Sequence, residues 1–505
     1  MSCSVRIKQA WIADGTGGDL FKADVLIVDG RIAAIEPEII GAAADRTLDF
    51  SRAEILAPGF IDVHGHSDVA ALVNPGAFAK VSQGVTTEIV GNCGLSAFPV
   101  TDANREHLAE LYANYGLAPK WRNYREFQAE LDRRNVDLRL PALCGHNTLR
   151  AAVSGYDTEK LSPTQLIRMT ELLAQQLEQG ALGLSSGLLY VPGKFADEAE
   201  LVALMRVLAR YDAIYTTHLR SEGAELLEAL AETLDFARAA KLRRVHISHF
   251  KTAGRANWHK LDEALAMLEA ARGEGMLVTV DRYPYTESLT QLSVILPGKW
   301  GDLDDGTIQR KLQDKETREA LSAELAGSRS PDYWQTVRLV SGNGADPTEC
   351  GKTLSEISPD PSRKVVELLA ADCAGTTAAF SGMSEENLAR ILALDFCMAG
   401  SDGNAFPADY RFGRAHPRAF GAIARFCRRR LDSGSSIPEV VWRLTGLAVQ
   451  TFQLPEIGVI RPGAPADLVA FDPETIDGNT DFAAPHTPAS GISWTMKAGK
   501  FVYRG

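Results

Sequence analysis

Eight short apolar stretches alternate with amphipathic helical stretches through the centre of the chain, and this alternation restricts the fold more than any other feature. The apolar stretches are strand-like and cover residues 59–63, 85–90, 138–143, 181–184, 214–217, 244–248, 277–280 and 396–399. Helical periodicity fills the segments between them, as at 163–178 and 261–274. Strands that alternate with helices run parallel, and eight such units close into a (β/α)8 barrel. We therefore expect an α/β fold with a TIM-like barrel at 58–454.

Both ends of the chain contain short alternating strands and glycine turns instead. Residues 1–57 include a hairpin signal at Asp29-Gly30, and residues 455–505 hold further strands around Ala498-Gly499. We expect these two ends to form one small β-sandwich domain. The segment of about 288–390, between the seventh and eighth strands, is too long for a simple loop and has a helical pattern at 314–325. We interpret it as an insertion over the mouth of the barrel.

Composition excludes several classes of partner. The net charge of −12 gives no basic face for nucleic acid. No apolar run approaches the roughly 20 residues that a membrane span requires. The start of the chain, Met1 to Arg6, lacks the apolar region of a signal peptide.

Seven cysteines without close pairing are typical of reduced thiols. We expect a cytoplasmic protein, and the sequence carries no signal for its oligomeric state.

Residue types that bind zinc follow several of the predicted strands. His64 and His66 follow the first strand, Cys93 the second, His218 the fifth and His249 the sixth. Taken singly, each is more often a buried structural residue. Together they lie where a barrel assembles its chemistry, at the carboxyl ends of its strands. Imidazole and thiolate ligands favour zinc over magnesium or calcium.

A carboxylate, Asp402, follows the eighth strand. Such a residue can cap a helix, but in a zinc hydrolase it can also serve as general base and acid beside the metal. His246 alternates out of phase on the sixth strand, so we exclude it from the site. His146 follows the third strand, where a site role and a structural role are both open.

The motifs around these residues resemble the amidohydrolase superfamily, and within it the N-acyl-D-amino-acid deacylases, or D-aminoacylases. The resemblance covers nearly the whole chain and is carried by residues 57–68, 84–94, 180–188, 217–220, 248–251, 281–286, 351–354, 400–403, 416–418 and 458–469. Cys93 is its most specific element. Many superfamily members bridge two metals with a carboxylated lysine on the fourth strand, but this chain has Leu184-Ser185-Ser186-Gly187 there.

The resemblance implies a ligand set. Cys93, His218 and His249 are expected to hold a tight zinc ion. His64, His66 and Asp402 are expected to surround a second position that is weaker or empty. Asp402 is expected to act as the catalytic base and acid.

The resemblance also implies a substrate with a free α-carboxylate, which needs a cation. Lys251, two residues past His249, is the first choice, and Arg418 and Arg220 are second choices. Tyr190, Tyr283 and Ser288 match family positions near the substrate. Arg282 stands where the family often has a small residue. If Arg282 reached the site, it would favour acidic side chains such as glutamate, although adjacent strand positions face opposite sides.

The predicted function is zinc-dependent hydrolysis of N-acyl-D-amino acids, with N-acyl-D-glutamate as one candidate substrate. The substrate is the only partner we expect. Hydrolysis of another amide, such as a dipeptide or a cyclic amide, is a second hypothesis. A non-catalytic scaffold on the same fold is a third, because a fold does not determine a function.

Overall fold

The computed structural model describes residues 4–41, 44–50, 53–156 and 160–505. The first three residues, which include Cys3 and half of the Met1–Arg6 segment considered for a signal peptide, lie outside it. Eight parallel strands form the barrel, in the order β6 Phe60–Asp62, β7 Val85–Glu88, β8 Cys144–Gly145, β9 Gly183–Gly187, β10 Ile214–His218, β11 Arg244–Ile247, β12 Leu277–Arg282 and β16 Cys397–Ala399. The predicted (β/α)8 architecture is confirmed.

Two places in the barrel depart from regular pairing. The predicted third strand, 138–143, is joined to its neighbour by isolated bridges, from Arg139 to Thr87 on β7 and from Ala142 to Val90 just after it, and regular pairing begins at β8. The barrel closes where Gly65 bridges Gly403 and the Val63 amide donates to the Ala399 carbonyl oxygen over 3.3 Å. This seam joins the first and last strands.

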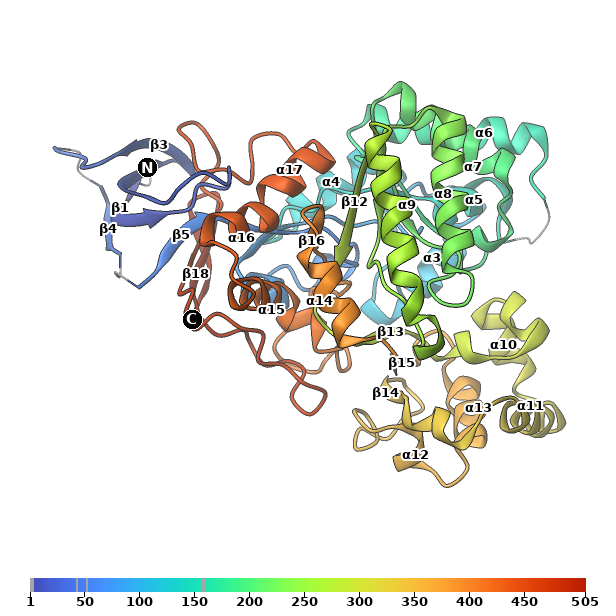
Figure 1. Cartoon of the computed structure of the whole chain (residues 1–505). Coiled ribbons are helices and arrows are strands. Elements are labelled where there is room, and N and C mark those ends of the chain that lie inside the picture. The colour runs from blue at the N-terminus through green and yellow to red at the C-terminus, as the bar shows by residue number, and fades with distance from the viewer. Residues whose placement is uncertain (1–3, 42–43, 51–52, 157–159) are drawn as a thin grey trace.

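Helices cover the outside of the barrel (Figure 1). The main ones are α4 Tyr124–Arg133, α5 His146–Ser154, α6 Pro163–Glu178, α7 Glu198–Arg210, α8 Leu226–Ala240, α9 Leu261–Gly273, α14 Glu385–Ala393, α15 Arg418–Asp432, α16 Ile437–Leu444 and α17 Gly446–Phe452, with short α1 Ala70–Val73, α2 Phe78–Val81 and α3 Arg105–Leu111. Local sequence fixes α6. Ser162 caps the helix and forms a capping box with Gln165, Pro163 stands at the first helical position, and the face with Met169 and Leu173 is buried.

Strands from both ends of the chain share one eight-stranded sheet, at the left of Figure 1. Its members are β1 Ser4–Ile12, β2 Phe21–Val28, β3 Arg31–Glu36, β4 Arg46–Asp49, β5 Ile55–Pro58, β17 Leu468–Phe471, β18 Ile492–Lys497 and β19 Lys500–Arg504. The predicted hairpin at Asp29-Gly30 has positive φ at both residues (50° and 77°), as a type I′ turn requires. The domain boundaries at 57/58 and 454/455 stay a prediction.

The insertion contains β13 Glu287–Gln291, α10 Asp305–Lys311, α11 Lys315–Ser328, β14 Val337–Ser341, α12 Leu354–Ile357, α13 Pro361–Ala371 and β15 Thr377–Ser381. Its three strands form their own sheet, and its apolar residues form a separate core around Leu321, Val337 and Leu369. It contacts the loop after β9, because the Tyr190 hydroxyl lies 3.3 Å from Thr290 Oγ1.

A buried ammonium joins the strands at the seam of the barrel. Lys80, on α2, is fully buried and donates to Asp62 Oδ2 and Ser401 Oγ, both at 2.7 Å, and to the Gly403 carbonyl at 3.1 Å. Glu88 Oε1 lies 3.5 Å from the same ammonium. Because a buried charge is tolerated only when it is paired, this cluster holds β6, β7 and the loop after β16 together.

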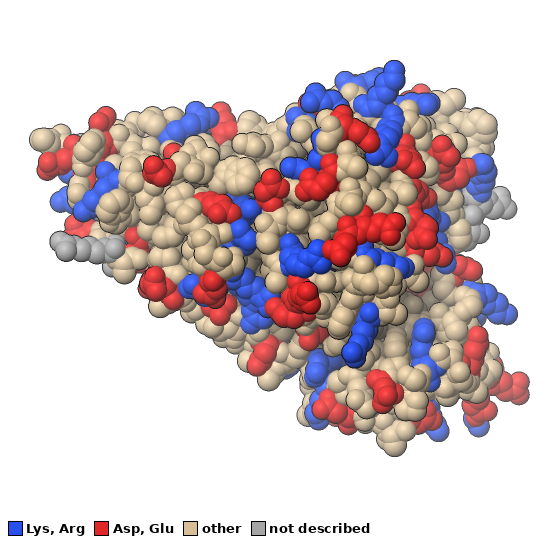
Figure 2. Space-filling view, viewed as in Figure 1, with Lys and Arg blue, Asp and Glu red and all other residues tan. Residues whose placement is uncertain are grey.

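Lys and Arg side chains are interspersed with Asp and Glu on the face that Figure 2 shows. The six described cysteines are free thiols. Among the helices of the described ranges, none has both the length and the apolar character needed to cross a membrane.

Asp24 offers a test of the terminal domain. Its carboxylate accepts hydrogen bonds from Arg6 at 2.6 Å, from the Gln9 amide at 2.9 Å and from the Ile39 amide at 3.1 Å. Burial alone would raise the pKa of Asp24, but these hydrogen bonds lower it to about 2. A lowered carboxyl pKa stabilises the fold above the unfolded pKa of about 4, and this contribution is lost as the pH falls through the folded pKa.

We predict that Asp24→Asn lowers the free energy of unfolding by about 1–2 kcal/mol at pH 7. The difference from the unsubstituted chain should be constant near pH 7 and should become smaller as the pH falls below about 4. Urea unfolding between pH 7 and pH 3 measures it, with Asp19→Asn, at an exposed acid before β2, as the control. An equal loss at every pH would contradict the assigned charge contribution.

Candidate metal centre

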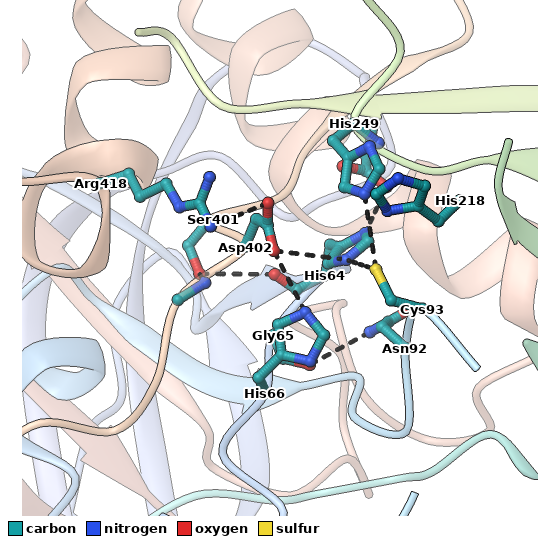
Figure 3. A network of polar contacts seen from close by, with 12 residues as sticks. His64, Gly65, His66, Asn92, Cys93, His218, His249, Ser401, Asp402 and Arg418 are labelled. Carbon is teal, nitrogen blue, oxygen red and sulfur yellow. Dashed lines mark hydrogen bonds and ion pairs between the residues drawn. The ribbon is translucent and has the colours of Figure 1, made fainter. Parts of the chain in front are cut away.

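The predicted ligand residues converge at the carboxyl ends of the barrel strands (Figure 3). His64 and His66 follow β6, Cys93 follows β7, His218 ends β10 and His249 follows β11. All are buried except His66, which is partly exposed. Segments that are far apart in sequence therefore supply one compact group of nitrogen and sulfur donors.

Three of the residues at this mouth have left-handed backbone. The φ angles are 53° at Cys93, 36° at His249 and 49° at Asp402. Residues with a Cβ rarely adopt this region, and each instance costs about 1 kcal/mol or more. Glycine would remove that strain but would also remove the thiol, imidazole or carboxylate. Strain of this kind is concentrated at functional sites.

Glycine is needed between the two histidines that follow β6. A Cβ built on Gly65 would lie 1.7 Å from Glu88 Oε1, which also accepts the Ser67 amide over 3.2 Å. The close approach of the buried Glu88 to the backbone explains the small residue in the His-Gly-His sequence.

Two groups of possible metal ligands share the Cys93 sulfur. One consists of His64, His66 and Cys93, and the other of Cys93, His218 and His249, with ligand atoms within 4.8 Å of one another in each group. Cys93 Sγ lies 3.4 Å from His64 Nε2 and 3.5 Å from His249 Nε2. The thiol is therefore positioned to serve both groups.

The donor set fits zinc. Both ring nitrogens of His218 are buried and have no hydrogen-bond partner among the described residues, and a buried polar atom without a partner is costly. A metal ion would satisfy one of them. One sulfur and several imidazole nitrogens form a typical zinc set, and three protein ligands leave a position for water.

Cys93 differs electrostatically from the other buried cysteines. Burial alone would raise the pKa of the Cys93 thiol, but the imidazoles of His64 and His249 hold it well below its usual range. Burial raises the pKa of Cys397, on β16, to about 12. Since the thiolate is the form that binds metals, Cys93 is prepared for a ligand role and Cys397 is not.

Asp402 lies between the histidines and a buried arginine. Its Oδ1 is 3.1 Å from His66 Nε2 and 3.8 Å from His64 Nε2, and its Oδ2 is 2.9 Å from Arg418 Nη2. Burial alone would raise the pKa of this carboxyl, but Arg418 and His66 hold it well below its usual range. Asp402 is therefore ionised and adjacent to the group of His64, His66 and Cys93.

Asp281, which the sequence analysis did not identify as a site residue, contacts three histidines. Its Oδ2 is 3.0 Å from His64 Nδ1 and 2.8 Å from His246 Nε2, and its Oδ1 accepts the His249 amide over 3.0 Å. A carboxylate on Nδ1 fixes the tautomer that leaves Nε2 of His64 free to face a metal.

His246, which the sequence analysis excluded from the site, belongs to neither group of possible metal ligands among the described residues, but it lies closer to the site than the strand alternation indicated. Period-two alternation would place it opposite His249, but β11 ends at Ile247 and His249 has a left-handed φ of 36°. His246 is buried and is joined to His64 through Asp281. His146 has a structural contact instead, because its Nε2 lies 2.8 Å from Glu200 Oε1, between α5 and α7.

A second carboxylate missed from the sequence, Glu222, lies beside His249. Glu222 Oε1 is 2.7 Å from His249 Nδ1, and it also accepts a short hydrogen bond from Lys251 Nζ. Lys251 Nζ is in turn 2.9 Å from His249 Nδ1 and 3.0 Å from the His249 carbonyl oxygen. Nothing in the spacing of the sequence marks Glu222, since it lies in a loop after β10.

The remaining predicted substrate residues divide into two sets. Tyr190 packs its ring 5.1 Å from that of His218, and Tyr283 is buried with its hydroxyl unpartnered among the described atoms. The ring of Tyr283 lies 4.6 Å from the Arg418 guanidinium. These two aromatic residues border the metal centre.

Ser288 lies on β13 opposite Phe380, in the sheet of the insertion, and no described contact joins it to the metal ligands. The contacts of Arg220 do not support a role in substrate binding. Its guanidinium is bound to Glu232 at 3.1 Å and to the Lys194 carbonyl at 2.8 Å. Arg282 is buried, donates to the Tyr285 carbonyl over 2.9 Å, and lies 4.1 Å from the Tyr283 ring.

Comparison with known proteins agrees with this geometry. Residues 54–313 match the model of the amidohydrolase family. The chain is 33% identical to an N-acyl-D-glutamate deacylase of Alcaligenes xylosoxydans xylosoxydans, over 98% of this chain and 93% of the relative. The crystal structure of an N-acyl-D-glutamate deacylase from Bordetella bronchiseptica, complexed with zinc and a phosphonate inhibitor, superposes with a TM-score of 0.83 at 31% identity, covering 99% of this chain and 96% of that one.

A D-aminoacylase structure concerned with a binuclear metal centre superposes with a TM-score of 0.80 at 29% identity, covering 99% of this chain and 96% of that one. The likeness extends over both ends, the barrel and the insertion, so it is not limited to the fold of the barrel. The chain belongs to the amidohydrolase family, in the group of the N-acyl-D-amino-acid deacylases.

Proposed function

We propose that this protein hydrolyses N-acyl-D-amino acids to a carboxylate and a free D-amino acid with the help of zinc. The observation that carries the proposal is the Cys93 sulfur shared by two groups of histidines, with the ionised Asp402 beside them. The relatives named above, one of them bound to zinc and a mimic of the tetrahedral intermediate, support the same reaction.

Cys93, His218 and His249 would hold the tight zinc ion, and His64, His66 and Asp402 would surround a second position. The D-aminoacylase relative is described in terms of one-metal activation and second-metal attenuation, which supports unequal sites. When bound, zinc would polarise the amide carbonyl and make the attacking water more acidic.

Asp402 would move the proton. Its carboxylate is ionised, so it can accept a proton from the attacking water and then deliver it to the nitrogen of the leaving D-amino acid. Arg418, at 2.9 Å, keeps the carboxylate charged and oriented. The bond from the acyl carbon to nitrogen breaks in the second step, and the carboxylate of Asp402 is regenerated.

The substrate's own α-carboxylate would bind Lys251, with Arg418 as a second cation. The unpartnered hydroxyl of Tyr283 and the Tyr190 side chain, beside His218, would contact the scissile amide or the α-carboxylate. Ser288 remains a candidate for substrate binding, and only the family resemblance supports it. Arg220 is left out, because Glu232 and backbone carbonyls occupy its guanidinium.

Within this reaction, a preference for substrates with an acidic side chain is a further part of the proposal. Arg282 Nε and Nη1 are buried without hydrogen-bond partners among the described residues, and the guanidinium stacks on Tyr283. A buried cation without a carboxylate is unfavourable. This observation favours substrates such as N-acyl-D-glutamate over those with apolar side chains.

We predict that the zinc-loaded enzyme hydrolyses N-acetyl-D-amino acids and leaves the L forms intact, and that Asp402→Asn lowers kcat by about 100- to 10,000-fold. Paired D and L substrates with glutamate and leucine side chains test the stereochemistry and the side-chain preference together. Asp409→Asn, at an exposed acid in the same loop, is the matched control. Turnover of neither series would favour the cyclic-amide, dipeptide or scaffold hypotheses.

Zinc binding is checked separately from activity. We predict that Cys93→Ser lowers the affinity for the tight zinc ion by more than the roughly 10–100-fold that loss of an outer partner causes. Metal content after equilibration with a competing chelator measures this. Cys350→Ser, at a partly exposed thiol in the insertion, should keep the metal. Full zinc retention in Cys93→Ser would exclude the thiolate as a ligand.

A further inference from the structure

Glu222 makes contacts that the hydrolytic mechanism does not use. A single carboxylate oxygen, Oε1, lies 2.7 Å from His249 Nδ1 and accepts the short hydrogen bond from Lys251 Nζ. The other oxygen, Oε2, lies 3.8 Å from His218 Nε2. The carboxylate is largely buried, with 14% of its side chain exposed. It therefore contacts one expected zinc ligand, His249, and the cation expected to bind the substrate, and it lies near a second expected ligand, His218.

The fold brings these groups together from two neighbouring strands. His218 ends β10 and Glu222 lies four residues later in the loop that follows, while His249 and Lys251 follow β11. Because β10 and β11 are paired in parallel, their following loops lie side by side at the mouth. Glu222, in the loop after β10, can therefore lie near His218 of β10 and also contact His249, which follows β11.

We propose that Glu222 is a positioning residue that couples the zinc ion to the binding of the substrate's α-carboxylate. As a charged acceptor 2.7 Å from His249 Nδ1, against the donor Lys251 Nζ at 2.9 Å, it favours the tautomer with the proton on Nδ1, which leaves Nε2 for the metal. As the counterion of Lys251, it holds the ammonium next to the same histidine. The position of the metal ligand and the position of the substrate cation are then set by one side chain. This inference rests on the proposed function for the role of Lys251.

Asp281 provides a comparison within the same site. It contacts Nδ1 of His64 as Glu222 contacts Nδ1 of His249, so both carboxylates orient an expected ligand. The ion pairs recorded for Asp281 in the described ranges, however, are to His64 and His246 and not to a lysine or arginine. Of these two supporting carboxylates, Glu222 is the one that also reaches a substrate cation.

Two measurements on Glu222→Gln test the coupling. Zinc affinity, measured by competition with a chelator, should fall by about 10–100-fold, as expected for loss of an outer partner. With zinc saturating, kcat/KM should be compared between an N-acetyl-D-amino acid and its primary amide, which lacks the α-carboxylate. We expect the preference for the free acid to fall by about tenfold or more, since small displacements of a binding group are costly.

Glu232→Gln is the control, because Glu232 is a partly exposed acid on α8 that pairs with Arg220 outside the site. Glu222→Asp, which keeps the charge on a shorter side chain, should recover part of both losses, and circular dichroism checks that each variant is folded. A fall in only one of the two quantities, or in neither, would overturn the coupling. If the unsubstituted enzyme hydrolyses no N-acyl-D-amino acid, the proposed function fails, and the zinc measurement still tests the contact with His249.

Discussion

The arrangement of the site depends on the buried ammonium of Lys80. It binds Asp62 at the end of β6, Ser401 and the Gly403 carbonyl after β16, and lies near Glu88 on β7. These segments carry His64, His66 and Asp402, so the seam that closes the barrel also brings the two sides of the site together. If the cation were absent, two fully buried carboxylates would lose their compensation, at a cost of several kcal/mol. The same buried ion pairs therefore stabilise the closure of the barrel and set the distance between the ligands on its first and last strands.

Beside this seam, the possible metal ligands form a central group and carboxylates surround it. Sulfur and imidazole donors face one another at the centre, and the carboxylates of Asp281 and Glu222 lie behind two of the imidazoles. The left-handed backbone at Cys93, His249 and Asp402 directs side chains into the centre directly after their strands or turns. Such strain is maintained because the surrounding hydrogen bonds determine the backbone, as when the Asp402 amide donates to the His64 carbonyl over 2.7 Å.

The periodic parts of the chain could be predicted well. Helix α6 was expected at 163–178 and is found there, because a capping box, a proline at its first position and an apolar face all agree. The third strand was less regular than its apolar run indicated, with only bridges before Cys144. Both ends of the chain were expected in one β domain, and they share one sheet because β5 pairs with β17.

The sequence by itself determined the order of strands and helices and the chemical types that follow each strand: two histidines, a cysteine, two more histidines and an aspartate. These follow from local periodicity and from the rule that barrel chemistry lies at the carboxyl ends of strands. Only the tertiary structure decided which groups support them. Asp281, Glu222 and His246 act through contacts between neighbouring strands, and the period-two rule fails where a left-handed residue turns the chain. The tertiary structure also decided that Arg220 pairs with Glu232 while Lys251 stays at the centre, because the partner of a long charged side chain depends on packing across loops.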